Sequence, residues 1–167
     1  MEPLYNDKEA IIEELENWIH EQICWKFDDQ KWSANQVIEH FVNSEFETFQ
    51  YLMKKTSSRL DGLESETDKH RESKKNSMHQ WLRINNGTPA VLPQPQGVKE
   101  IELWIHHWRE LVHKLRERLE QVPKNTEEKL LTKHPLSGRL NLEQTMNLLI
   151  EHIVHHGHQL RHIQEKW

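Results

Sequence analysis

Four long segments of the sequence carry apolar residues at steps of three and four, and this period constrains the fold more than any other feature. The spacing is that of an amphipathic α-helix with one apolar face. The segments cover about residues 8–27, 33–55, 98–119 and 141–167, and no stretch has a convincing strand pattern. The sequence therefore predicts an all-α fold, a four-helix bundle with its apolar faces turned inward.

Two of these segments begin with an N-terminal capping signal. Ser33 is followed three residues later by Gln36, and Asn141 is followed in the same way by Gln144. In such a capping box, each side chain accepts a hydrogen bond from the backbone N–H of the other residue. We therefore expect the second helix to begin at Ser33 and the last helix at Asn141.

The connection between the second and third predicted helices has no helical pattern. Residues 57–80 are mostly Ser, Glu, Lys, Asp and Arg, and residues 85–97 contain three prolines and two glycines. Such compositions are typical of solvated or irregular chain. Because neither side can build a complete core alone, we interpret residues 57–97 as a long ordered crossover inside a single domain, residues 1–167.

Composition argues against several classes of protein. The formal net charge is −5 with no basic block, so nucleic acid is not an expected partner. There is neither an apolar run of about eighteen residues nor a signal-peptide pattern at the N-terminus, and we expect a cytoplasmic protein without a membrane segment. Cys24 is the one cysteine, which excludes an internal disulfide; we expect it to be a small buried residue rather than a nucleophile.

Five histidines lie on the last predicted helix, and their angular positions divide them into two groups. At about 100° per residue, His156 lies roughly 20° from Leu149 and His152 roughly 60° from it, toward the apolar face. The other three fall on the polar side: His155, His158 and His162. Two buried imidazoles one turn apart can bind one metal ion. The alternative is a pair of core histidines hydrogen-bonded to other side chains.

The second predicted helix carries two more candidate residues. His40 lies about 100° from Phe41, at the edge of the apolar face, where it faces either a neighbouring helix or solvent. Glu45 lies among apolar residues, and a carboxylate in such a place is usually paired or hydrogen-bonded. A surface position at the helix edge is the alternative for Glu45.

Three motifs then occur in a fixed order along the chain: Trp32-Ser33 with His40 seven residues later, His134-Pro-Leu-Ser-Gly138, and His152-Ile-Val-His-His156 followed by Gln159. In this order they resemble the DinB/YfiT superfamily of metalloenzymes. The resemblance covers nearly the whole chain except residues 57–97. It implies a DinB-like four-helix bundle in which His40, His152 and His156 bind a divalent metal ion.

The resemblance also implies a class of chemistry. Three neutral imidazoles leave a metal ion with an open position for water or a thiolate, and zinc and nickel both accept such ligands. DinB-like proteins include small-molecule hydrolases and transferases of low-molecular-weight thiols, and we expect this chain to be one of these. Gln159 and Glu45 are the candidates for orienting a ligand or acting as a base.

A hypothesis from another class is a non-catalytic, stress-related bundle that binds a metal ion or a small ligand. The resemblance and the seven tryptophans are also compatible with a homodimer. Because only neutral imidazole binds metal, a site of three histidines is expected to release its ion below about pH 6.

Overall fold

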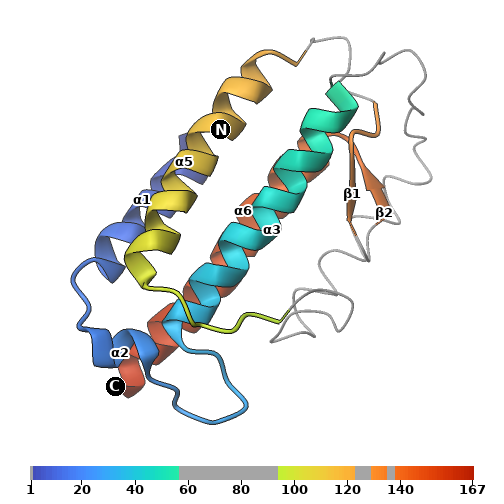
Figure 1. Cartoon of the computed structure of the whole chain (residues 1–167). Helices are drawn as coiled ribbons and strands as arrows, with labels where there is room; N and C mark the ends of the chain where they lie inside the picture. Colours follow the sequence, from blue (N-terminus) through green and yellow to red (C-terminus); the bar gives the residue numbers. More distant parts are fainter. Residues whose placement is uncertain (1, 57–93, 123–128, 135–137) are drawn as a thin grey trace.

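The computed structural model describes residues 2–56, 94–122, 129–134 and 138–167, and it is mostly helical (Figure 1). The elements in chain order are α1 (Glu2–Leu15), α2 (His20–Cys24), α3 (Ala34–Thr56), α5 (Ile101–Glu120), β1 (Thr132–His134), β2 (Gly138–Leu140) and α6 (Leu142–Lys166). The predicted all-α class is confirmed. Residues 57–93 of the predicted crossover lie outside the described residues.

The long helices in the described part of the chain lie side by side, and α3 packs against both α5 and α6 (Figure 1). Helices α3 and α5 run in the same direction, while α1 and α6 run the opposite way. The C-terminal end of α6 lies near α2, where the rings of Trp25 and Trp167 meet at 5.8 Å. No helix in the described ranges is both long and apolar enough to cross a membrane.

The prediction of one continuous helix over residues 8–27 is wrong. Helix α1 ends at Leu15, and α2 begins five residues later, after a turn. The break changes the angular phase, so that α2 buries Ile23 and leaves Cys24 exposed. The thiol of Cys24 lies 3.6 Å from Nε2 of His20, one turn away on the same helix. The expected buried position of Cys24 is therefore also wrong.

Both predicted capping boxes are present. The backbone N–H of Ser33 donates to Oε1 of Gln36 at 3.1 Å, and the N–H of Gln36 donates to Oγ of Ser33 at 3.3 Å. Asn141 and Gln144 exchange the same pair of bonds at 3.1 and 2.9 Å. The caps fix where α3 and α6 begin, and they thereby set which side chains on these helices face each other.

Residues 94–99 fasten the entry to α5 onto the first turns of α3. Oε2 of Glu39 accepts hydrogen bonds from the backbone N–H groups of Gln96 and Gly97 at 2.8 and 2.6 Å. Gly97 has φ +67°, and a Cβ there would lie 2.9 Å from Cγ of Gln36. A glycine is required here, because the backbone is left-handed and the two segments approach closely.

A short antiparallel hairpin, β1–β2, precedes α6, where the sequence has no convincing strand pattern. Thr132 pairs with Leu140 and His134 with Gly138, which has φ +73°. The hydroxyls of Thr132 and Thr145 are hydrogen-bonded at 2.5 Å, which attaches the hairpin to α6. Three-residue strands are too short for an alternating pattern to show in the sequence.

A buried ion pair joins α1 to α3. Nζ of Lys8 lies 2.5 Å from Oε2 of Glu45, and their side chains are 1% and 0% exposed. Trp108 of α5 donates its indole N–H to the same oxygen at 3.1 Å. Three helices therefore meet at one carboxylate, and the expectation that Glu45 is paired is confirmed.

Replacement of Lys8 by methionine tests this contact. Lys8→Met keeps most of the side-chain volume but leaves the Glu45 carboxylate buried without its cation. We expect a loss of about 3–5 kcal/mol in the free energy of unfolding, measured by urea denaturation.

Arg109→Gln is the matched control, because Arg109 pairs with Glu9 and Glu16 at exposed positions. Its expected loss is below about 1 kcal/mol. A loss for Lys8→Met no larger than that of Arg109→Gln would contradict the stabilising role of the buried pair.

Candidate metal centre

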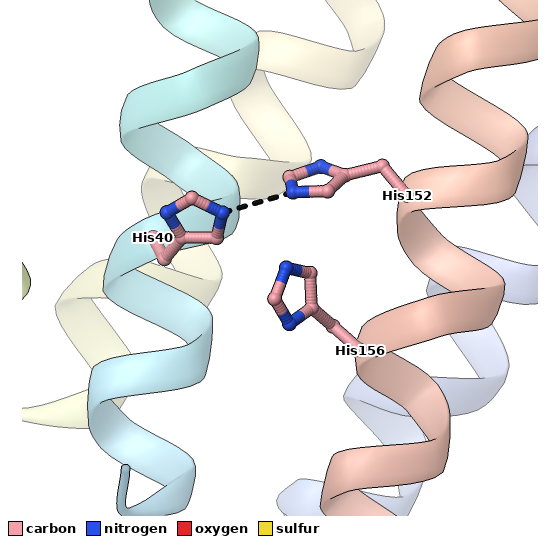
Figure 2. A group of neighbouring side chains, drawn as sticks. All are labelled: His40, His152 and His156. Atoms are coloured by element: carbon pink, nitrogen blue, oxygen red, sulfur yellow. Dashed lines mark hydrogen bonds between the residues drawn. The ribbon is translucent and has the colours of Figure 1, made fainter. Parts of the chain in front are cut away.

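The three histidines predicted as ligands come together between α3 and α6 (Figure 2). His40 projects from α3, and His152 and His156 project from α6, one turn apart. One ring nitrogen of each lies within 4.8 Å of the others, and all three side chains are buried. The inward position of His152 and His156 is confirmed. His40, whose direction the helical pattern left open, faces α6.

His40 and His152 meet through their Nε2 atoms, which lie 2.9 Å apart (Figure 2). Between two neutral imidazoles, one of these atoms donates and the other accepts. The centroids of the three rings are 4.6 to 4.9 Å apart. The polar atoms thus converge on one small region between the two helices.

Gln159 determines the tautomer of His156. Oε1 of Gln159 lies 2.6 Å from Nδ1 of His156. Because an amide oxygen can only accept, Nδ1 carries the proton, and Nε2 keeps the lone pair that a metal ion needs. The hydrogen-bonding role expected for Gln159 is present in the structure, with His156 as its partner.

Aromatic rings enclose the histidines. Phe41 of α3 meets His152 and His156 edge to face at 5.4 and 5.3 Å. The ring of Trp32, just before α3, stacks on that of His156 with 5.9 Å between the ring centroids, and its centroid lies 5.1 Å from that of His40. These rings keep water away from the imidazoles, which disfavours their charged forms.

The enclosure lowers the pKa of two of the histidines. Burial lowers the pKa of His40 to about 4, with a smaller effect from the nearby His155. Burial, followed by repulsion from His40, lowers the pKa of His156 to about 3, and the bond to Gln159 opposes this shift. Both rings are therefore neutral well below pH 6. Protons therefore compete with a metal ion for these two rings at a lower pH than they would for ordinary histidines.

The donor set fits a divalent metal ion. A tetrahedral site with metal–nitrogen bonds of about 2.0–2.1 Å has its ligand nitrogens about 3.3 Å apart. The Nε2 atoms of His40 and His152 are within a few tenths of an ångström of that spacing, and the three ligand nitrogens all lie within 4.8 Å of one another. Zinc and nickel both accept buried neutral imidazoles. Within the described part of the chain, no other group of three His, Cys, Asp or Glu residues comes as close together.

Glu45 lies on the same helix as His40 but has different partners. Among the described residues, its carboxylate makes polar contacts with Lys8 and Trp108. Phe41 stacks on Trp108 at 5.0 Å and also contacts the histidines, so aromatic rings lie between the two polar groups. A role for Glu45 beside a metal ligand stays a prediction, while its contacts favour holding α1 to α3.

The polar face of α6 differs from the prediction at one position. His158 and His162 are exposed as expected. His155 is half-buried instead, and its ring meets that of His156 at 4.8 Å.

Trp32 was predicted only as part of a helix start, but its ring covers the site. Its position directly before the capping residue Ser33 is the signal that places it there.

Metal-free protein is expected to lose stability as the pH falls from about 6.5 to about 4. The unfolded chain takes up protons near the ordinary pKa of 6.5, whereas folded His40 and His156 take them up near 4 and 3. Their stabilising contribution is complete above pH 6.5 and is lost as the pH falls through this window. Urea denaturation is expected to give an unfolding free energy lower by about 2 kcal/mol or more at pH 5 than at pH 7.

His156→Gln is expected to flatten this pH dependence, whereas His107→Gln, at an exposed position on α5, keeps that of the wild type. An equally steep dependence in His156→Gln and the wild type would show that His156 does not contribute to it.

Comparison with known proteins agrees with the site. The family model described as the DinB superfamily matches residues 5–160, a range that includes all three histidines. No curated protein and no solved structure gave a match. The family match extends over most of the sequence, from α1 into the C-terminal part of α6. This chain belongs to the DinB superfamily.

Proposed function

We propose that this protein is a metal-dependent enzyme that acts on a small molecule, either hydrolysing it or transferring a low-molecular-weight thiol to it. The observation that carries the proposal is the convergence of His40, His152 and His156 in a buried site. A divalent ion, zinc or nickel, held by three imidazoles supplies an open position at which a water or thiolate is made more nucleophilic.

The surrounding residues support this chemistry. Gln159 holds the proton of His156 at Nδ1 and so leaves Nε2 free to bind. Phe41 and Trp32 keep bulk water away from the imidazoles, which strengthens polar interactions inside the site. None of these three side chains exchanges a proton. Gln159 orients His156, and Phe41 and Trp32 enclose the site.

A pocket next to the histidines favours an enzyme over a purely structural metal site. Its volume is about 570 Å³, and Trp32 and Gln159 are part of its wall. Binding sites for small molecules typically have volumes of about 300–1,000 Å³. A substrate in this pocket would lie beside the residues that contact His156.

Metal content tests the ligand set. After loading with zinc or nickel and removal of free ion, we expect one ion per chain by elemental mass spectrometry. His40→Gln, His152→Gln and His156→Gln are each expected to lose it, because two imidazoles bind a divalent ion much more weakly than three.

His158→Gln is the matched control, since His158 lies on the same helix but is exposed. It should keep the ion, and circular dichroism should show that all four variants remain folded. A wild type that binds no ion, or a His156→Gln variant that binds as much as His158→Gln, would refute the proposed centre.

Turnover tests the enzymatic part of the proposal. Metal-loaded protein is expected either to couple cysteine to 1-chloro-2,4-dinitrobenzene or to hydrolyse p-nitrophenyl acetate. Both reactions can be followed by absorbance, and the one that proceeds identifies the class of enzyme. His40→Gln is expected to lower its kcat/KM by about 100-fold or more. Full metal occupancy with neither reaction would instead favour the non-catalytic binding protein.

A further inference from the structure

The pocket beside the histidines lies between residues 27–32 and the C-terminal half of α6. Two residues of its wall also contact the metal centre: Trp32 stacks on His156, and Gln159 is hydrogen-bonded to it. His40, His152 and His156 do not line the pocket themselves, so a ligand in it contacts the two side chains that cover His156. The chemistry of the remaining wall indicates what kind of ligand fits.

The wall has an inner and an outer part, which differ in exposure. The inner part consists of the buried Ile163 and three half-buried residues: Trp32, His155 and Gln159. The outer part consists of exposed residues: Phe27, Lys31, His158 and His162. His162 follows His156 by six residues, which is about 9 Å along an α-helix. A ligand that reaches from the histidines to the outer part is thus longer than a single functional group.

The charge of the wall is opposite to that of the protein. The chain carries a formal net charge of −5, yet the wall contains Lys31 and no acidic residue. Glu165, 4.0 Å from Nδ1 of His162, is not part of the wall. A lysine ammonium beside a partly enclosed apolar space attracts an anionic group of a ligand.

His158 adds a hydrogen-bond donor to this side. Nη2 of the Arg161 guanidinium lies 2.9 Å from Nδ1 of His158. Because a guanidinium can only donate, Nδ1 accepts, and the neutral ring carries its proton on Nε2. The outer wall therefore offers an ammonium group and an imidazole N–H, both of which suit a carboxylate.

The rest of the wall suits an apolar or aromatic body. Phe27 is 45% exposed, and its ring meets that of His162 edge to face at 5.4 Å. Together with Trp32 it presents two aromatic surfaces to the pocket. A ligand that covers them removes apolar surface from water, which favours binding.

We infer that this pocket binds a small organic acid whose carboxylate pairs with Lys31, whose apolar or aromatic body lies on Phe27 and Trp32, and whose reacting end lies against Gln159, the wall residue hydrogen-bonded to His156. The inference rests on the proposed function and specifies its class of substrate. It assigns Lys31 to substrate selection, a role independent of metal binding.

Calorimetric titration with 2-naphthoate and with the neutral 2-naphthamide tests the inference, because the two probes have nearly the same shape. Wild-type protein, metal-loaded and metal-free, is expected to bind the acid about tenfold more tightly than the amide. Lys31→Gln should remove most of this preference by weakening acid binding alone. Lys133→Gln, at an exposed site on β1, is the control and should change neither affinity.

Phe27→Ala separates the apolar contribution, and it is expected to weaken both probes by a similar factor. Equal affinities for acid and amide in the wild type, or an unchanged preference in Lys31→Gln, would overturn the inference. A preference that vanishes on metal removal but survives Lys31→Gln would place the carboxylate on the metal ion and overturn it as well.

Metal content measured on the same samples distinguishes this inference from the proposed function. Lys31→Gln with full metal occupancy and an unchanged acid preference refutes the pocket assignment alone. A wild type without metal that still prefers the acid through Lys31 refutes the proposed enzyme while the binding preference of the pocket stands.

Discussion

The burial of three imidazoles between α3 and α6 imposes a requirement on every group around them. Each ring has two nitrogens, and a buried polar nitrogen without a partner is costly. The structure meets this requirement in part through the contact of His40 with His152 and the bond from His156 to Gln159. The convergence that satisfies these nitrogens also produces a set of neutral side chains that could bind a metal ion. Stability and ligand chemistry therefore depend on the same contacts.

A second buried polar group lies on the other side of Phe41. There Lys8 and Trp108 contact the carboxylate of Glu45, and α1, α3 and α5 meet. The ring of Phe41 stacks on Trp108 and also borders the histidines. Helix α3 thus contributes Glu45 to a buried ion pair with α1 on one face and His40 to the histidine cluster on another, with an aromatic layer between them. Burial, to which this layer contributes, keeps His40 and His156 neutral at ordinary pH.

The sequence predicts the parts of this arrangement that depend on one helix alone. His152 and His156 were placed correctly because both share an angular sector with Leu149, and the capping box at Asn141 sets the start of their helix. His40 lies at the edge of its own apolar face, and only the neighbouring helix decides which way an edge residue points. For His40 the family resemblance supplied what the helical period could not.

Contacts between distant segments were not predictable. Lys8, near the middle of α1, is indistinguishable in the sequence from a surface lysine, because its partner Glu45 comes 37 residues later. The break after Leu15 contains neither proline nor glycine, so no local signal marks it. The exposure of Cys24 follows from that break. His155 is half-buried in the wall of a pocket that it shares with Trp32, a residue 123 positions earlier in the sequence.

The distribution of the histidines also has a consequence for biosynthesis. His40 lies 112 residues before His152, and the contact between them requires α3 and α6 together. During translation the earlier imidazole emerges long before its two partners, so the nascent chain has no complete set of donors until α6 has been made. Contacts of such sequence separation form late, since a long loop must close first. A complete set of three imidazoles at this centre therefore requires that α6 has been synthesised and has packed against α3.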